Sequence, residues 1–405
     1  MQPKNNPLLI IILGALTAMA PFSIDMYLPA FPSVAEDLNT PVSTIQLSLA
    51  SFFVGMALGQ LFIGPLSDRL GRKTPLYLGL ALYMVASVAC ALAPSAISLI
   101  AFRFVQAVGG CAGVVIARAV VRDLFVPQEI ARVFSLLMLV TGAAPIIAPT
   151  VGGILLTYIS WRAIFIALAV IAALILAGAW IGLPETRPPD PSVSLRPGAV
   201  LRGYAAIFRN PQFGVYVLAG GIASAGMFAY IAGSPFVYIE YFGVPQTQYG
   251  WIFGANAFGL ISAGQVNRYW LKSHLPEQIL LKVCAVQSLA GLCLVLVAAQ
   301  GYGGLAAMLI LNFIFVAAMG FIFPNTTALA MAPFSKQAGA ASALMGSLQF
   351  VVAALASSVV SALHNGTAVP MTGTMAACGL TAFLILRLAV KRVTPAVQLN
   401  VSDSK

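Results

Sequence analysis

The sequence predicts an all-α integral membrane protein, with twelve transmembrane helices arranged as two six-helix half-domains. Hydrophobic residues make up 60 % of the 405 residues and charged residues only 8 %, whereas a soluble domain carries roughly 25 % charged residues. The resulting total of about 243 apolar side chains is enough for about twelve membrane helices of ~20 residues each. A Pro-rich hydrophilic segment near the middle divides these helices six and six.

The individual spans follow from apolar runs that lie between charged or Pro- and Gly-rich breaks. They are expected at residues 8–30, 44–66, 75–94, 98–120, 133–157, 162–183, 212–235, 248–267, 277–299, 304–324, 338–363 and 369–390. The first run also imitates a signal peptide, because Lys4 precedes it and Ala18–Ala20 resembles a cleavage site. The apolar run continues through Pro21 and further spans follow, so a retained first helix is the stronger interpretation.

Basic residues outside the spans gather on one side of the membrane when both termini are placed on that side. The segments there hold Lys4, Arg69, Arg72, Lys73, Arg122, Arg132, Arg187, Arg196, Arg202, Arg209, Arg268, Lys272, Lys336, Lys391, Arg392 and Lys405. The opposite segments hold Arg162 together with the acids Glu36, Asp37 and Glu240. The positive-inside rule therefore predicts cytoplasmic termini. The net charge of +10 is thus explained by the basic residues on the cytoplasmic side of the membrane, and no nucleic-acid partner is expected.

The longest hydrophilic break, residues 184–210, contains five prolines and four arginines. Such a segment is typical of a linker between domains. We therefore expect an amino-terminal half at residues 1–183, a cytoplasmic linker at 184–210, a carboxyl-terminal half at 211–390 and a cytoplasmic tail at 391–405. Spans two and eight share a Gly-rich pattern, and internal duplication of this kind is typical of secondary transporters.

Several classes of site are not expected from the sequence. The five cysteines lie in apolar runs without a Cys-x-x-Cys pair, and the two histidines lie far apart, so neither a disulfide framework nor a metal site is predicted. No phosphate-binding Gly-x-x-x-x-Gly-Lys loop, Gly-x-Ser-x-Gly elbow or His-Glu-x-x-His pair occurs. We expect no catalytic residues, no enzymatic activity and no cofactor.

Two charged residues fall at membrane depth, where ionisable groups are costly and usually functional. Asp25 lies near the outer end of span one, and Arg103 lies one to two turns inside the outer end of span four. At 1.5 Å per residue both sit roughly 8 Å below the outer surface, so mutual contact is sterically allowed. We expect them to take part in proton coupling, because a carboxyl can gain a proton when buried and lose it when a cation or water approaches. The alternatives are a helix-end acid that reaches water and a structural counter-charge.

The most specific motif lies between spans two and three and consists of Gly64, Asp68, Arg69, Gly71, Arg72 and Lys73. It resembles the loop signature Gly-x-x-x-Asp-Arg-x-Gly-Arg-Arg/Lys of the major facilitator superfamily. The resemblance implies a cytoplasmic latch, in which Gly64 permits close helix approach and Asp68 faces the positive amino-terminal end of span eleven. Such a latch would favour the outward-open state. In the carboxyl half, the matching loop has Asn267 where Asp68 stands, so no second latch is expected.

Span five contains Pro145, Pro149, Gly152 and Gly153, which predict a kinked and closely packed helix. This pattern resembles the antiporter signature Gly-Pro-x-x-Gly-Gly of the same superfamily, with Ala148 in place of the first glycine. Together with the motif of the previous loop, it assigns a gating or conformational role to Gly64, Asp68, Arg69, Gly71, Arg72, Pro145, Pro149, Gly152 and Gly153.

A narrower resemblance is carried by short segments spread over the whole chain. They are Ser23 to Pro29, Arg122-Asp123, Trp161, Pro184-Glu185-Thr186 and Pro235 to Glu240. These segments are similar to the bicyclomycin-resistance/CflA family of drug–proton antiporters. The resemblance implies a monomer in the bacterial inner membrane that exports bicyclomycin- or chloramphenicol-like drugs in exchange for protons, with the proton gradient as energy source.

Polar and aromatic side chains within the spans are candidates to bind the exported molecule. We select Phe22, Tyr27, Gln106, Tyr230, Asn256 and Asn312, although each can equally serve as interhelical contact. The sequence thus predicts a secondary transporter of small amphiphilic drugs that works by alternating access, embedded in a lipid bilayer. Export of a metabolite such as a sugar or nucleoside is the first alternative. A transporter-like receptor or membrane enzyme is the remote one.

Overall fold

The computed structural model describes residues 7–125, 127–193, 195–301 and 303–393. The predicted tail at 391–405 lies almost entirely outside these residues. The predicted all-helical class is confirmed, because every regular element in the described ranges is a helix. Eleven of these helices are long and apolar enough to cross a membrane. The chain is therefore a multi-pass membrane protein.

The amino half contains six long helices, and the first of them is interrupted. Its elements are α1 (Pro7–Asp25), η2 (Leu28–Ala30), α2 (Phe31–Asp37), α3 (Val42–Leu70), α4 (Lys73–Ala91), α5 (Ala96–Leu124), α6 (Pro127–Tyr158) and α7 (Trp161–Gly182). Local signals set several boundaries. Ser95 begins α5 through a reciprocal capping box with Ser98, and Gly71 follows α3 with a positive φ of 83°.

The carboxyl half repeats this plan with six long helices. Its elements are α9 (Pro211–Pro235), η3 (Phe236–Tyr241), α10 (Gln246–Trp270), α11 (Pro276–Gln300), α12 (Gly304–Met331), η4 (Ala332–Gln337), α13 (Ala338–Ala362) and α14 (Val369–Val393). Helix α10 coincides with the predicted span 248–267 but is not among the eleven apolar helices. Its polar residues, which include Asn256, Gln265 and Asn267, lower its hydropathy.

The linker is more ordered than its composition predicts. Within the predicted segment 184–210 the structure contains helix α8 (Pro197–Phe208), which starts with Pro197 at a position that tolerates the missing N–H. Tyr204 and Ile207 are buried on one face of this helix. The Tyr204 hydroxyl donates a hydrogen bond to the carbonyl oxygen of Leu61 in α3 (3.1 Å). Burial raises the pKa of Tyr204 to about 12, with a smaller contribution from the charge of Asp68.

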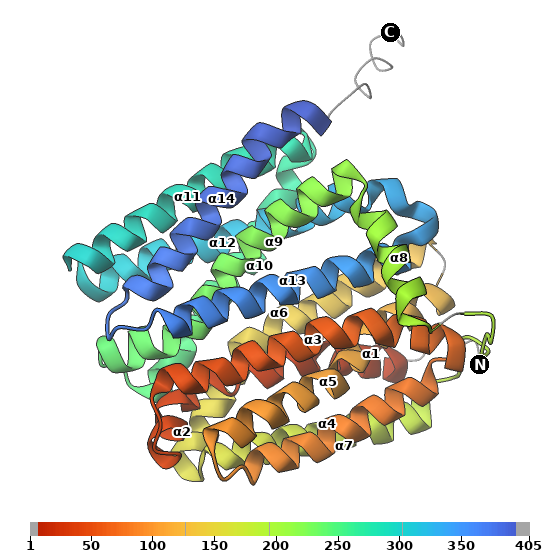
Figure 1. The fold of residues 1–405 in the computed structure, drawn as a ribbon, viewed down its shortest axis with the longest axis horizontal. Coiled ribbons are helices and arrows are strands. Elements are labelled where there is room, and N and C mark those ends of the chain that lie inside the picture. The colour runs from red at the N-terminus through yellow and green to blue at the C-terminus, as the bar shows by residue number, and fades with distance from the viewer. Residues whose placement is uncertain (1–6, 126, 194, 302, 394–405) are drawn as a thin grey trace.

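The two halves lie side by side and meet along two helix pairs (Figure 1). Helix α3 packs against α13, and α6 packs against α10. We call the end of the bundle that carries residues 183–210 the linker end, and the end that carries α2 the α2 end. Helix α8 runs across the linker end between the two halves. The contact between the halves is therefore formed mainly by α3, α6, α10 and α13.

Candidate functional site

Asp25 occupies the break in the first membrane helix. Helix α1 ends at Asp25, residues 26–27 form a turn, and η2 begins with Leu28 and Pro29. The Asp25 side chain is only 4 % exposed, and no hydrogen bond joins its carboxyl to another described residue. The position also lies at the negative end of the α1 dipole. The chain therefore buries an unpaired acid at the one place where its first span is discontinuous, a construction typical of transporter sites.

Arg103 is enclosed inside the amino half and is fully buried. Its Nη1 donates to Gln106 Oε1 (2.6 Å) and its Nη2 to the carbonyl oxygen of Ser23 (3.1 Å). Its guanidinium carbon lies 4.2 Å from the ring centre of Phe52 and 5.0 Å from that of Tyr27. Cation–π contacts of this kind partly replace a counter-ion. Arg103 is thus held by rings and neutral acceptors, and its Nε has no partner.

The structure does not bring Asp25 and Arg103 into contact, although their equal depth allows it. The electrostatic neighbours of Arg103 are Tyr27, Tyr83 and Cys90, all in the amino half. Asp25 instead lies within electrostatic range of Tyr230 and Tyr249 of the carboxyl half, on which its ionised form would act. Arg103 thus has its neighbours in the amino half and Asp25 has neighbours in the carboxyl half, a difference that equal depth in the membrane does not predict.

Tyr230 and Tyr249 belong to a buried polar group that faces Asp25 from the carboxyl half. Asn256 donates to the Tyr230 hydroxyl (2.7 Å), and the hydroxyls of Ser234 and Tyr249 lie 2.7 Å apart. On the π-helical turn η3, the Tyr238 hydroxyl accepts a hydrogen bond from Asn312 (2.7 Å). The Oδ1 atom of Asn312 is buried without a partner. We call Tyr230, Ser234, Tyr238, Tyr249, Asn256 and Asn312 the tyrosine cluster.

The six predicted substrate-binding residues separate into two groups. Tyr27 and Gln106 are fully buried inside the amino half, where they contact Arg103, and they line neither of the two cavities described below. Phe22 is half-buried against the same core. The other three, Tyr230, Asn256 and Asn312, lie together in the tyrosine cluster. The structure therefore places Tyr27 and Gln106 around Arg103, and it places the three carboxyl-half residues in the cluster that faces Asp25.

At the α2 end the two halves are in direct contact. The Ser361 hydroxyl donates to the carbonyl oxygen of Ser43 (2.7 Å), which joins α13 to the start of α3. Gly250 of α10 packs against Thr150 of α6. Closer to the middle, the rings of Phe53, Phe228 and Phe350 pack together across the interface, with ring centres 4.9 to 6.1 Å apart. These contacts close the α2 end.

The gating residues predicted in α6 lie at this closed end. A Cβ atom at Gly152 would overlap the carbonyl oxygen of Met26, so only glycine allows the break after α1 to pack on α6. Gly153 faces the start of α10, where a Cβ would lie 3.5 Å from the carbonyl oxygen of Gln246. Helix α6 continues through Pro145 and Pro149. The four residues therefore occupy the helix that joins the broken first span to the carboxyl half.

At the linker end a cavity of about 730 Å³ separates the halves. Its walls come from α3, α5, the linker, α8 and the start of α13, and they include Gln60, Gly64, Asp68, Arg72, Arg118, Arg122, Asp123, Arg187, Tyr204, Gln337 and Gly339. We call this space the linker-end cavity. Since the α2 end is closed and the linker end is hollow, the structure represents the state that is open toward the linker.

The motif between α3 and α4 forms an ion-pair network on the wall of this cavity. Arg72 binds Asp68 (2.7 Å) and Asp123 of α5 (2.8 Å), and Arg187 of the linker also binds Asp68 (3.1 Å). Burial acts to lower the pKa of Arg72, but Asp123 and Asp68 outweigh it and raise that pKa above its ordinary value. Glu185 accepts hydrogen bonds from the backbone N–H groups of Arg72 and Lys73.

The predicted latch is not formed in this state. Asp68 is bound by Arg72 and Arg187, and among the described residues no hydrogen bond links it to the start of α13. The close helix approach expected at Gly64 for the latched state is not present in this state, because nothing lies within 4 Å of the position of its Cβ. At the level of Gly64, the linker-end cavity lies between α3 and α13. Arg69 instead contacts the linker, because its backbone carbonyl oxygen accepts a hydrogen bond from the backbone N–H of Asp190 (3.1 Å).

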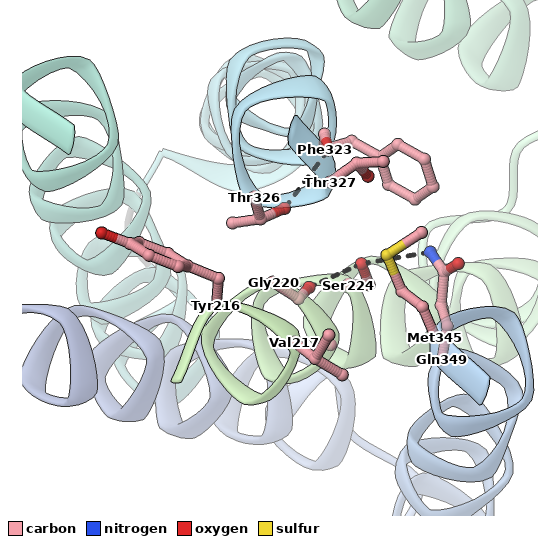
Figure 2. Close-up of a pocket in the computed structure, with 10 residues that line it drawn as sticks. Tyr216, Val217, Gly220, Ser224, Phe323, Thr326, Thr327, Met345 and Gln349 are labelled. Atoms are coloured by element: carbon pink, nitrogen blue, oxygen red, sulfur yellow. Dashed lines mark hydrogen bonds between the residues drawn. The ribbon is translucent and has the colours of Figure 1, made fainter. Parts of the chain in front are cut away.

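A second, much smaller pocket lies inside the carboxyl half between α9, α12 and α13 (Figure 2). Its volume is about 20 Å³, which is room for about one water molecule. Gln349 reaches across it to the Ser224 hydroxyl (3.4 Å), with Thr326 on the opposite wall. A pocket of this size cannot hold a drug, so the space between the halves remains the candidate transport path.

Sequence reasoning missed the partners of the loop motif. Asp123, Glu185 and Arg187 complete the network, yet the first two were noted only as parts of short family segments. Their signal was present, because Asp123 is an acid directly at the end of an apolar span and Glu185 is the first acid after one. The sequence does not predict Tyr249 as a neighbour of Asp25, because the spacing of the two residues carries no motif.

Comparison with known proteins agrees with this architecture. The model of the Major Facilitator Superfamily matches residues 13–357. The chain belongs to the major facilitator superfamily. The "Bicyclomycin resistance protein homolog" of Haemophilus influenzae is 34 % identical over 93 % of this chain and 94 % of its own length. "Multidrug resistance protein D" of Escherichia coli is 32 % identical, over 86 % and 87 %.

Another superfamily member, the "Uncharacterized MFS-type transporter YdgK" of Bacillus subtilis, is 36 % identical over 92 % of both chains. Among solved structures, a D-xylose–proton symporter has a TM-score of 0.73 at 15 % identity and covers 94 % of this chain and 97 % of its own. At this identity the likeness supports the fold alone. The predicted membership of the superfamily and of its bicyclomycin-resistance branch is confirmed.

Proposed function

We propose that this superfamily member exports small amphiphilic drugs in exchange for protons by alternating access, with Asp25 as the proton-carrying group. The named drug-resistance relatives support the substrate class. The single observation that carries the proton role is the enclosed, unpaired Asp25 carboxyl at the break of the first span. We also propose that the linker end faces the cytoplasm of a bacterial inner membrane and that the protein is a monomer.

Asp25 is suited to this role because its surroundings belong to both halves. An unpaired carboxylate is costly in an enclosed site, so the enclosed acid holds a proton. When the halves separate at the α2 end, water replaces the tyrosine cluster around the carboxyl and the proton can leave. The ionised form is then available to favour drug exchange until it is protonated again. Arg103 supports this cycle by fixing the backbone at Ser23, two residues before the acid.

The experiment is transport in proteoliposomes that contain purified protein and a pH-sensitive dye. Addition of a transported drug is expected to drive proton movement in the wild type, and Asp25→Asn is expected to reduce the rate at least about tenfold while the protein remains folded. Glu36→Gln removes an exposed acid of α2 and is the matched control. Unchanged coupling in Asp25→Asn would refute the proton role.

The substrate class is tested by growth inhibition across antibiotic classes in an efflux-deficient host. Resistance that is lost in Asp25→Asn supports drug export. If the host gains no resistance to any compound, although the purified protein still conducts protons in proteoliposomes without drug, the alternative of metabolite export is favoured.

A further inference from the structure

The charges on the wall of the linker-end cavity do not balance. The two acids on this wall, Asp68 and Asp123, are already bound by Arg72 and Arg187. Arg118 and Arg122 line the same cavity, and neither has an ion pair with a described residue. They lie one turn apart on α5, and their charges act on one another. Arg122 Nε donates a hydrogen bond to the carbonyl oxygen of Arg118 (3.3 Å), and the charges of Asp68 and Asp123 act on Arg122 without forming an ion pair with it. Two neighbouring guanidinium groups that are not ion-paired to a described residue therefore face this space.

A third positive element converges on the same place. Gln337 precedes α13 without a side-chain cap, so the first N–H groups of that helix are not satisfied by a capping side chain. The Nη1 atom of Arg122 reaches this turn, since a Cβ at Gly339 would lie 3.1 Å from it. A cation at the amino-terminal end of a helix is unfavourable, whereas an anion there is stabilised. The juxtaposition is thus unfavourable until an anion lies between α5 and α13.

The inner wall of the cavity offers a neutral donor. Gln60 of α3 is 2 % exposed and lines the cavity, and its side-chain amide makes no hydrogen bond to another described residue. Its amide oxygen lies against Gly346 of α13. Its NH₂ group is the type of donor that an oxyanion accepts.

We propose that the linker-end cavity binds a phosphate-type oxyanion between Arg118 and Arg122 of α5 and the first turn of α13, with Gln60 at its inner wall. Arginine matches the geometry of phosphate through paired N–H donors, and helix ends bind such groups through backbone N–H. Free phosphate and the phosphodiester of an anionic lipid share this chemistry. Because the ligand joins the amino half to the carboxyl half, it stabilises the state that is open toward the linker.

The proposal is independent of the exported drug, and its test contains neither drug nor proton gradient. Thermal unfolding of the purified full chain is measured in phosphatidylcholine nanodiscs, with inorganic phosphate as the first probe and sodium chloride of equal ionic strength as reference. In a second arm, phosphatidylglycerol replaces part of the phosphatidylcholine. Either probe is expected to raise the unfolding temperature of the wild type. A rise with phosphate indicates a free anion, and a rise with phosphatidylglycerol alone indicates a lipid headgroup.

Variants separate this site from general ionic effects. Arg118→Gln and Arg122→Gln are each expected to raise the half-saturating concentration of the effective probe at least about tenfold, whereas Arg118→Lys retains most of the response. Arg202→Gln removes an arginine of α8 that does not line the cavity, and it is expected to respond as the wild type does. Arg122 is exposed, so its variant keeps the test valid if Arg118→Gln does not fold. Equal responses in the wild type and both Gln variants, or no response to either probe, would overturn the proposal.

Discussion

Arg103 is hydrogen-bonded to the carbonyl oxygen of Ser23 (3.1 Å) and not to the carboxyl of Asp25, two residues further along the same helix. The cation therefore holds the end of α1 in place from the amino-half side, while the acid faces the carboxyl half. The proton exchange that we propose at Asp25 would then change contacts between the halves without breaking an ion pair inside one of them. This relationship makes the two charges separable by mutation.

We predict that Asp25 and Arg103 contribute independently to stability. Arg103→Lys loses the two-donor geometry and the close ring contacts, and it is expected to cost about 2–3 kcal/mol. Asp25→Asn is expected to change stability far less, and the double variant should be additive within about 0.5 kcal/mol, as for sites without contact. Thermal or denaturant unfolding of the four proteins in detergent measures the cycle. A coupling above about 1 kcal/mol would show that the two groups form a pair.

A second prediction concerns Gly152, where α6 meets the break in the first span. Gly152→Ala is expected to push Met26 away and to destabilise the closed α2 end by about 1–3 kcal/mol. Gly153→Ala is the matched control, because its Cβ would make only an ordinary contact. Cysteines at Ser43 and Ser361, which are in contact in the closed state, report the effect as disulfide yield. Equal yields in the two glycine variants would contradict the overlap at Gly152.

The turn after α3 gives a third prediction. Gly71 has φ 83° and ψ 175°, a conformation that residues with a Cβ rarely adopt. A Cβ there would also lie 2.9 Å from Glu185 Oε2, which accepts a hydrogen bond from the Lys73 N–H. Gly71→Ala is therefore expected to cost about 1–3 kcal/mol. Gly203→Ala in α8, where the added methyl meets open space, is expected to be neutral or to stabilise by up to about 1 kcal/mol. The unfolding temperatures of both variants check this contrast.

Much of the fold is predictable from the sequence because membrane insertion dictates long apolar helices. The twelve runs, the central linker and the loop motif at 64–73 all follow from local composition. The site is less predictable, because it depends on how helices rotate about their axes. Asp25 and Arg103 occupy similar depths, yet packing of Phe52 and Tyr27 turns the arginine inward.

The sequence also does not predict which end of the protein is open. The latch implied by the family resemblance is expected when the linker end is closed, whereas the structure has that end open. Gly64 therefore faces empty space and Asp68 binds Arg187 of the linker. Helix α8 is not predicted for a different reason, because prolines and arginines dominate the composition around its short apolar face. Linker composition alone predicts an irregular chain there.

The last prediction concerns the attachment of that helix to the amino half. Burial raises the pKa of Tyr204 to about 12, from an ordinary value of about 10. The folded state therefore keeps a proton that the unfolded state loses first, so the contribution of Tyr204 is complete below about pH 10 and is lost as the pH rises to about 12. Because the helix lies at the protein surface, this contribution is expected to be at most about 2 kcal/mol.

The variant Tyr204→Phe is expected to make the unfolding temperature fall less steeply between pH 10 and 12. It should also remove the hydrogen bond to Leu61, which is worth about 1 kcal/mol at neutral pH. Tyr158→Phe, at an exposed position, controls for loss of a hydroxyl. An unchanged slope in Tyr204→Phe would show that α8 does not hold this tyrosine buried against α3.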